Sequence, residues 1–383
     1  MYFVLVTMKK VSLIIGICIV ILALVSITFN YSNNPAQPEM IKIGVIAPLT
    51  GDAAIYGVPL QKGLDLAKYE INLHGGFGGK KVQLIYEDSM ADPKNAVSAF
   101  NKLNSVDKVP IIIGDMFSST TLAIAPLAQK NKILLLSPTA SSQEVPNTGD
   151  YIFSIYPSDN YDGNFIADFT VKSLNKKNVS IIYAQADAMI GVKNAFRDSF
   201  TKSGGMIIAE ESYVSNTNDF RTILIKIKAG NPEVIFIPGY LEDNVKLLKQ
   251  AKELGITSPF ITISTAYDEK LFSIAGNSAD NLMLSAPFYD SNSQNPKIVA
   301  FQNAYKIKYG DSPNVWAAYG YDSLNIINDA QTQSLKNSVP LAIAMSSIKD
   351  YDGVTGKTTF SDNRTVQKQL RMMIVRNSSF VNY

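Results

Sequence analysis

The sequence predicts an α/β protein with two Rossmann-like lobes, each built around a mostly parallel sheet and joined by several crossovers. Short apolar segments alternate with longer helix-like segments from residue 41 to residue 330, an order typical of parallel sheets covered by helices. The strands are too numerous for one Rossmann unit, which favours two lobes. Ligands of such sheets bind at the carboxyl ends of the strands, and we expect a binding site there.

The first half of this alternation starts with a compact apolar strand, which is followed by a turn containing Gly and Pro. Apolar runs of this kind, bounded by turn residues, are typical of buried strands. Strands are expected over 41–47, 82–87, 110–114 and 133–137, and helices over 58–73, 93–103 and 120–130.

The second half repeats the pattern. We expect a first lobe from residues 41–156 and 285–349, and a second lobe from residues 157–284 and 350–383. Strands are expected over 179–183, 206–211, 234–238, 260–264 and 282–286, and helices near 191–203, 219–229, 243–254, 296–309 and 316–330.

Residues 1–40 are expected to form an N-terminal signal anchor and a linker. Lys9 and Lys10 precede the apolar run 11–29, which contains no charge. A helix of this length spans about 29 Å, close to the thickness of the bilayer hydrocarbon. Because positive residues stay inside, the rest of the chain is expected outside the cytoplasm. A signal that is cleaved after export is the alternative. Cys18 follows Ile17 rather than a small residue, which argues against lipidation.

Charge and composition exclude several classes of function. Without Lys9 and Lys10, the 35 basic and 33 acidic residues become 33 of each, and a neutral chain argues against a nucleic-acid partner. With one cysteine and one histidine in the sequence, no catalytic residue, metal site or cofactor is expected. We interpret His74 as a turn or helix C-cap residue, because its Gly-rich loop follows a helix rather than a strand.

Two clusters of Ser and Thr residues directly follow neighbouring strands, at 114–121 and 137–142. Free backbone amides and hydroxyls at such strand ends bind anionic groups. Either cluster alone is also explained by helix capping, here from Ser118 or Ser119. Together they suit a carboxylate or another small polar head group. The candidate contact residues in these segments are Met116, Ser118, Thr139 and Ser141.

Two tyrosines occupy corresponding places after strands. Tyr56 lies in the first strand–helix turn, and Tyr240 follows the strand that contains 235–237. Ligand clefts are mostly apolar with few polar groups, so we interpret these rings as cleft walls. Ordinary packing in the core or on the surface is the alternative interpretation.

From residue 41 to residue 380 the sequence resembles the branched-chain amino-acid binding family, the Leu/Ile/Val-type periplasmic receptors of ABC transporters. Each matching motif is short, and their order and spacing carry the resemblance. The motifs are IKIGVIAPLTG at 41–51, Tyr56-Gly57, Ile71-Asn72, EDSMADP at 87–93, Gly114 with Ser118-Ser119-Thr120, SPTA at 137–140, IAG at 274–276, WAAYGYD at 316–322 and DGVTG at 352–356.

The resemblance implies a type I periplasmic binding fold and roles for the matching residues. Ser118 and Ser141 would bind a ligand carboxylate through their hydroxyls and backbone amides. The carbonyl of Thr139 would accept a hydrogen bond from an α-ammonium group. Tyr56 and Tyr240 would flank the ligand side chain.

The sequence also departs from this family near the expected ammonium site. Ser264 stands where amino-acid binders of the family have a glutamate, and Ile190 stands where an aromatic residue is frequent. A buried ammonium without a carboxylate partner is costly. Either Asp159, which matches an acidic position near the cleft, or Asp187 or Asp243 pairs with the ammonium, or the ligand is a carboxylate or amide without an amine.

The expected function is therefore capture of a small organic ligand, an amino acid in the first instance, for delivery to an ABC permease. A ligand-sensing domain for a signalling partner is the alternative, because it uses the same fold. A nucleotide-dependent enzyme is disfavoured, because the residues after the first strand, 47–52, contain no Gly-x-Gly-x-x-Gly turn.

Overall fold

The computed structural model describes residues 17, 19–22, 39–287, 289–362, 364–366 and 368–383. The predicted apolar run 11–29 lies outside the described residues except for 17 and 19–22. Among the residues that are described, no helix combines the length and the apolar character needed to cross a membrane. Residues 1–39 and 40–383 are separate units, and the description below concerns residues 40–383.

The first sheet has five parallel strands in the order β2-β1-β3-β4-β5. Its central strands are short and wholly buried, as expected for a parallel sheet covered on both faces. The strands are β1 (Met40–Ala47), β2 (Lys81–Asp88), β3 (Ile111–Ile113), β4 (Leu134–Ser137) and β5 (Ile152–Ser154).

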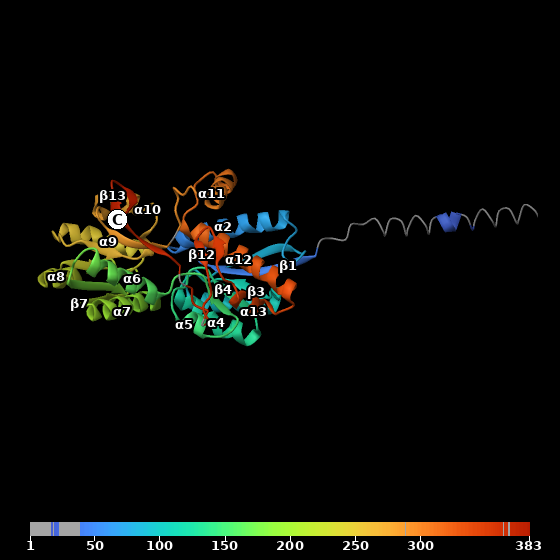
Figure 1. The fold of residues 1–383 in the computed structure, drawn as a ribbon, viewed down its shortest axis with the longest axis horizontal. Coiled ribbons are helices and arrows are strands. Elements are labelled where there is room, and N and C mark those ends of the chain that lie inside the picture. The colour runs from blue at the N-terminus through green and yellow to red at the C-terminus, as the bar shows by residue number, and fades with distance from the viewer. Residues whose placement is uncertain (1–16, 18, 23–38, 288, 363, 367) are drawn as a thin grey trace, which may run out of the picture. The chain divides into compact units, whose positions relative to one another are not determined.

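Helices from both ends of the chain pack beside this sheet, and Figure 1 shows α2 and α12 next to β1, β3 and β4. His74 is the C-cap residue of α2, as the sequence predicted. The helices are α2 (Ala54–Leu73), α3 (Pro93–Lys102), α4 (Ser118–Asn131), α5 (Glu144–Asn147), α11 (Pro296–Tyr309), α12 (Val315–Asn337) and α13 (Leu341–Ser346), with a π-helical turn at Leu103–Asp107.

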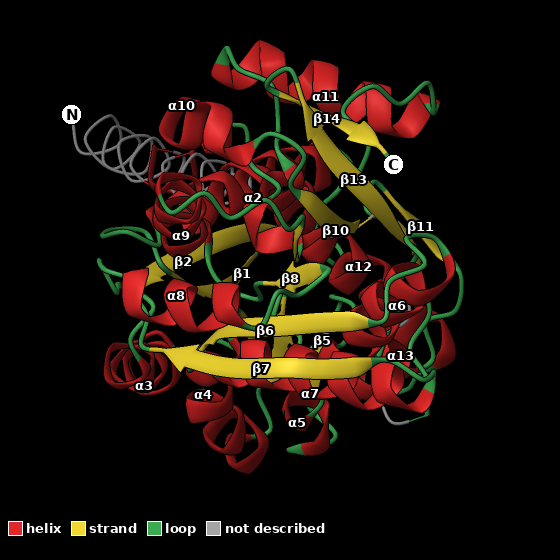
Figure 2. Cartoon of the chain, turned by 90° about the vertical axis from the view of Figure 1, so that its left-hand side faces the viewer, coloured by secondary structure: helices red, strands yellow, loops and turns green. Residues whose placement is uncertain are grey.

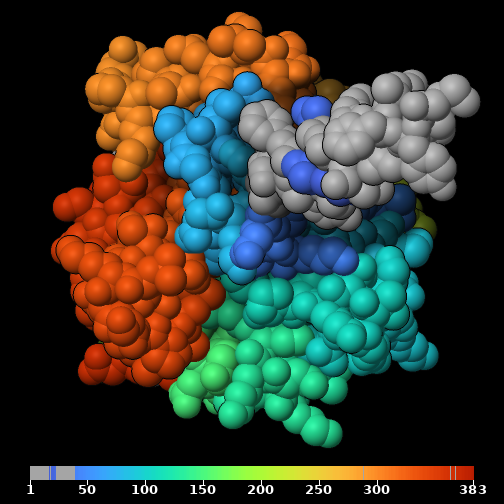
Figure 3. Space-filling model, turned by 90° about the vertical axis from the view of Figure 1, so that its right-hand side faces the viewer, coloured from blue at the N-terminus to red at the C-terminus, as the bar shows by residue number. Residues whose placement is uncertain are grey.

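Helices α2 and α12 cross at two glycines, where their backbones touch. A Cβ atom on Gly63 would lie 2.0 Å from the carbonyl oxygen of Ala317, and one on Gly320 would lie 2.3 Å from that of Leu60. Only residues without a side chain allow this approach. The late segment 315–337 is therefore an integral part of the first lobe's core, and Figure 3 shows late, orange-red residues side by side with early, blue ones.

The second sheet has seven strands in the order β14-β13-β10-β9-β8-β6-β7. It is parallel from β7 to β10, and the C-terminal strands β13 and β14 add to it antiparallel (Figure 2). The strands are β6 (Asn178–Ala184), β7 (Met206–Tyr213), β8 (Val234–Phe236), β9 (Phe260–Thr262), β10 (Met283–Pro287), β13 (Leu370–Arg376) and β14 (Ser379–Asn382). The helices are α6 (Asp159–Lys172), α7 (Asp187–Lys202), α8 (Arg221–Ala229), α9 (Leu241–Glu253) and α10 (Lys270–Ala275), with 3-10 turns at Ser264–Ala266 and Gly276–Ala279.

The described chain passes between the two sheets after β5, after β10 and before β13. The expectation that all of 350–383 joins the second lobe is wrong for its first part. Val354, Phe360 and Val366 pack in the core of the first sheet, and the chain reaches the second sheet only at β13. The physical reason is a hairpin, formed by β11 (Tyr351–Gly353) and β12 (Gly356–Thr358), whose turn binds α12.

The hairpin is held by a buried charged network. Asp322 of α12 accepts hydrogen bonds from the amides of Val354 at 3.0 Å and Thr355 at 2.8 Å, and from the hydroxyl of Thr355. The ammonium of Lys368 donates to the same hydroxyl and lies 4.9 Å from the centre of the Tyr319 ring. Burial lowers the pKa of Lys368 to about 8, against the opposing effect of Asp322. This network ties the last crossover to the first lobe.

Candidate functional site

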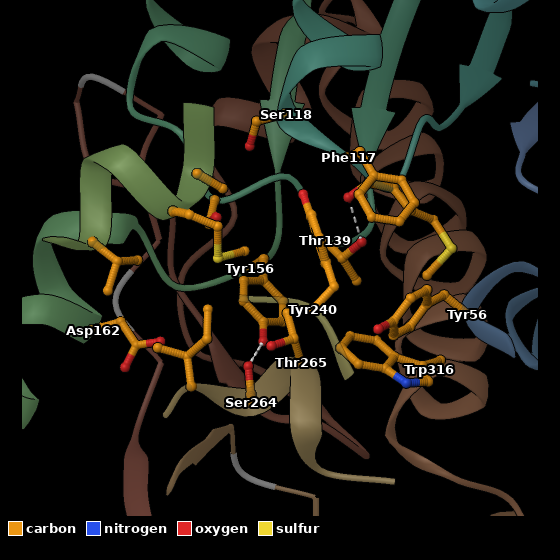
Figure 4. Close-up of a pocket in the computed structure, with 16 residues that line it drawn as sticks. Tyr56, Phe117, Ser118, Thr139, Tyr156, Asp162, Tyr240, Ser264, Thr265 and Trp316 are labelled. Carbon is orange, nitrogen blue, oxygen red and sulfur yellow. Dashed lines mark hydrogen bonds between the residues drawn. The ribbon is translucent and has the colours of Figure 1, made fainter. Parts of the chain in front are cut away.

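A cavity lies between the two sheets, at the carboxyl ends of strands from both (Figure 4). The first sheet contributes the loops after β3, β4 and β5, and the second contributes α7 and the segments after β8 and β9. The lining residues are Tyr56, Met116, Phe117, Ser118, Thr139, Ser141, Tyr156, Asp162, Ala188, Met189, Val192, Tyr240, Ile263, Ser264, Thr265 and Trp316.

Most of the site residues expected from the sequence meet at this cavity. The structure brings seven of the nine together there, and Asp159 and Asp187 are not among the described lining residues. The seven are Tyr56, Met116, Ser118, Thr139, Ser141, Tyr240 and Ser264.

The hydroxyl side of the cavity is fixed by hydrogen bonds between the two predicted loops. The Ser118 hydroxyl accepts from the amide of Ser142 at 3.2 Å, and the Thr139 hydroxyl donates to the carbonyl of Met116 at 2.8 Å. The prediction that Ser118 or Ser119 caps the helix is wrong, because α4 begins at Ser118 and its N-cap is Phe117. The Ser118 hydroxyl is therefore held at the cavity wall by the neighbouring loop rather than by the helix.

Aromatic rings form another part of the wall. The Tyr56 ring packs edge-on against Trp316 at 5.3 Å and Phe117 at 5.8 Å between ring centres, and Phe117 packs against Tyr240 at 5.4 Å. The Tyr56 hydroxyl accepts a hydrogen bond from the amide of Leu241 at 3.3 Å. Since Tyr56 belongs to the first lobe's core and Leu241 to the second's, this bond joins the two lobes beside the cavity.

The apolar lining comes mainly from the second sheet. Met189 and Val192 face the cavity from α7, and Ile263 follows β9. Ile190, at the position where the resemblance implies an aromatic residue, is 37% exposed and not among the described lining residues. An aliphatic group of moderate size is the chemistry that such walls accommodate.

At the floor of the cavity, Ser264 lies in the position where the resemblance implies a glutamate. Its hydroxyl is hydrogen-bonded to the hydroxyl of Tyr156 (Figure 4). Tyr156 was not predicted as a site residue, because it lies in the crossover after a short strand that was not predicted. This hydroxyl pair is polar but uncharged, so it supplies no counter-ion for a cation.

A carboxylate instead enters the cavity from α6. Asp162 is 6% exposed, and its Oδ1 atom has no hydrogen-bond partner among the described residues. Burial raises the pKa of Asp162 to about 6, and the nearby hydroxyl of Ser285 acts in the opposite direction. Asp162 was not predicted as a site residue, because no helix was expected over 159–172.

The three acids considered from the sequence lie elsewhere. Asp159, one helical turn before Asp162, is buried against Gly191, where a Cβ atom would come within 2.4 Å of its Oδ2 atom. Burial raises the pKa of Asp159 well above its usual value. Asp187 and Asp243 line a second cavity, which shares the rings of Tyr56, Phe117 and Tyr240 with the first.

The raised pKa of Asp162 predicts a pH-dependent stability. The unfolded chain loses this proton near pH 4, whereas the folded chain keeps it up to about pH 6. The folded state thus loses stability as the pH rises through this window, by at most about 3 kcal/mol. Asp162→Asn keeps the shape without the charge, so the ligand-free variant should be more stable than the wild type at pH 7.5 and equal to it near pH 4.

Urea unfolding of the ligand-free protein between pH 4 and pH 7.5 measures this difference. Asp168→Asn is the matched control, since Asp168 lies on the same helix with its side chain 51% exposed, and its stability should follow that of the wild type. A constant difference between Asp162→Asn and the wild type across this range contradicts the prediction.

Comparison with known proteins assigns the chain to a family. Residues 40–379, nearly all of the unit that holds the cavity, match the family model for periplasmic binding proteins. The chain belongs to the periplasmic binding protein family. Periplasmic binding proteins are binding proteins rather than enzymes and lie outside the cytoplasm.

Several relatives of this periplasmic binding protein are of the branched-chain amino-acid type. The Leu/Ile/Val-binding protein of Escherichia coli K12 is 28% identical over 291 residues, which are 75% of this chain and 78% of that protein. The leucine-binding protein LivK of Thermotoga maritima superposes with a TM-score of 0.84 at 27% identity, covering 90% of this chain and 97% of that one.

A further solved relative, LivJ of Streptococcus pneumoniae in complex with isoleucine, is 30% identical and has a TM-score of 0.82. The match covers 89% of this chain and 98% of that one. The predicted resemblance to the branched-chain amino-acid type and the predicted two-sheet α/β fold are therefore confirmed.

Proposed function

We propose that this chain is the extracytoplasmic substrate-binding component of an ABC transporter and that it captures an amino acid with an aliphatic side chain. One observation carries the proposal: hydroxyl-bearing loops of one sheet line the same cavity as apolar and aromatic side chains from both lobes. An α-amino acid with an aliphatic side chain combines the same two parts, a charged head group and an apolar side chain. The isoleucine bound to the relative from Streptococcus pneumoniae supports this ligand class.

Within this proposal each wall has a separate role. Ser118 and Ser141, with the backbone around Thr139, bind the ligand carboxylate. Tyr56 and Tyr240 flank its side chain. An amine-free carboxylate is the second candidate ligand, favoured by the uncharged Ser264 at the floor.

The two sheets are proposed to be the cores of two lobes that close over the ligand by hinge motion. Residues 40–156, together with α11, α12 and the hairpin that follows them, form one lobe, and the elements of the second sheet form the other. The bond between Tyr56 and the amide of Leu241 belongs to the closed form. A permease that recognises this form would accept the loaded receptor.

The N-terminal segment is proposed to be a retained membrane anchor. The lysines at 9 and 10 and the apolar run 11–29 support it. Such an anchor would keep the receptor beside its permease.

Calorimetry on residues 40–383 with amino acids, organic acids and amides tests the proposed function. A hydrogen bond to a charged group contributes about 1.5–3 kcal/mol, so Ser118→Ala and Ser141→Ala should each weaken binding of the preferred ligand by about 10- to 100-fold. Ser98→Ala, an exposed hydroxyl on α3, should leave the affinity unchanged.

Two outcomes contradict the proposal. Absence of binding across the whole panel rejects the receptor function. Undiminished affinity in the double variant Ser118→Ala/Ser141→Ala rejects the assigned carboxylate site while leaving a receptor function possible.

A further inference from the structure

The cavity contains one feature that the proposed function does not use, the Asp162 carboxyl group. It projects from the first turn of α6 and is the one charged side chain among the described lining residues. Figure 4 shows it on the opposite side of the cavity from Tyr56 and Trp316. The acid therefore faces the end of the cavity that lies away from the aromatic wall.

No cation among the described lining residues pairs with Asp162, although the Ser285 hydroxyl stabilises its charged form. The lining residues include no Lys, Arg or His. The Tyr156 hydroxyl is engaged by Ser264, and Oδ1 of Asp162 has no hydrogen-bond partner among the described residues. A buried carboxylate without a cationic partner is costly, by several kcal/mol, and buried acids of this kind are concentrated at functional sites.

The other acids near the cavity are not among the described residues that line it, although Oδ1 of Asp159 also has no hydrogen-bond partner among the described residues. Asp159 is wedged against Gly191, and its own amide is bonded to the carbonyl of Ser141 at 2.9 Å. Asp243 accepts a hydrogen bond from the amide of Asn216 at 3.1 Å, and both Asp243 and Asp187 line the second cavity. Among the described lining residues of the first cavity, Asp162 is the one that carries a carboxyl group.

We propose that Asp162 forms the subsite for the primary ammonium group of the ligand and thereby sets the specificity for amines over amine-free analogues. The inference rests on the proposed function. The ligand carboxylate lies on the hydroxyls of the first lobe, and its ammonium pairs with an acid of the second lobe. Ligand binding then bridges the two lobes through opposite charges, and Ser264 is free to form its bond with Tyr156.

The test compares two probes of nearly equal shape, isoleucine and 2-hydroxy-3-methylpentanoate, in which a hydroxyl replaces the ammonium. The wild type should prefer isoleucine by about 100-fold or more, since a desolvated charge pair contributes several kcal/mol. Asp162→Asn should weaken isoleucine binding by about 100-fold and change hydroxy-acid binding by less than about threefold. Titration calorimetry at pH 7.5 measures both affinities.

Three variants serve as comparisons, and circular dichroism establishes that each is folded. Asp168→Asn, on the exposed side of the same helix, should keep the wild-type preference. Asp159→Asn and Asp187→Asn should retain a preference for isoleucine. If either of these two removes it while Asp162→Asn does not, the assignment to Asp162 is overturned.

The remaining outcomes separate this inference from the proposed function. A wild type that binds both probes equally well is still a receptor, but it has no ammonium subsite. Equal loss of both probes in Asp162→Asn identifies a structural role for Asp162 and also overturns the inference. A wild type that binds neither probe, and no other member of the ligand panel, rejects the receptor function and the subsite with it.

Discussion

Asp322→Asn is expected to lower the free energy of unfolding by about 3–5 kcal/mol, because it leaves a buried lysine without its counter-ion. Lys368 is 1% exposed, and its ammonium reaches the Asp322 carboxylate through the hydroxyl of Thr355. The asparagine side chain also has only one acceptor oxygen, so it cannot accept from the Val354 amide on one oxygen and from Thr355 on the other, as the carboxylate does. Denaturant unfolding of the ligand-free protein at pH 7 measures the loss.

A second substitution separates the charge effect from the loss of hydrogen bonds. Lys368→Met in the Asp322→Asn background removes the uncompensated ammonium and should restore part of the stability. Lys172→Met is the matched exposed control: its partner is Asp168 at 2.8 Å, with side chains 70% and 51% exposed, and it should cost less than about 0.5 kcal/mol. A loss below about 1 kcal/mol in Asp322→Asn contradicts the assigned role of the network.

Gly320→Ala is expected to destabilise the protein by about 3 kcal/mol, although alanine favours a helix over glycine by about 1 kcal/mol. The new methyl group would lie 2.3 Å from the carbonyl oxygen of Leu60, so α2 and α12 must move apart. Because the packing of α2 on α12 holds the segment 315–337 in the core of the first lobe, separating the two helices would expose apolar side chains of that core to water. Thermal and urea unfolding measure the effect.

Thr332→Ala is the control for this substitution, since Thr332 is an exposed residue of the same helix. It should change stability by less than about 0.5 kcal/mol. Gly63→Ala probes the other side of the crossing, where a Cβ atom would lie 2.0 Å from the carbonyl of Ala317, and should behave like Gly320→Ala. Full stability in both glycine variants would show that the helices separate without cost.

The sequence predicted the strands from β1 to β4 and from β6 to β10 because buried parallel strands carry a local signal, whereas β5, β13 and β14 were not predicted. A run such as Ile111–Ile113 is short and apolar, and the polar turn that follows it marks the end of the strand. The hydroxyl side of the cavity was predictable for the same reason: the carboxyl ends of neighbouring parallel strands meet at one edge. Ser118 and Ser141 are therefore found together although 23 positions separate them in the sequence.

The second lobe's side of the cavity was harder to predict. Helix α6 opens with Asp159, Asn160, Tyr161, Asp162 and Gly163, a composition typical of turns. Its close packing on α7, where a Cβ atom on Gly163 would lie 2.5 Å from the carbonyl of Val192, turns this segment into a buried helix end. No local pattern reveals that contact, so Asp162 was missed.

The hairpin formed by β11 and β12 was assigned to the wrong lobe for a similar reason. Its sequence has no periodicity that distinguishes one core from the other. The lobe to which the hairpin belongs is determined by the carboxylate of Asp322. This residue lies 32 residues before Val354 in the sequence and accepts a hydrogen bond from the Val354 amide. Pairings of this kind depend on tertiary structure alone.

The repeated passage of the chain between the two sheets has a consequence for its biosynthesis. The five strands of the first sheet are complete at residue 154, but the helix that covers them, α12, ends at residue 337 and the hairpin bound to it ends at residue 358. A nascent chain therefore cannot finish its first lobe until most of the polypeptide has been made. Such an order of assembly delays compact folding during synthesis.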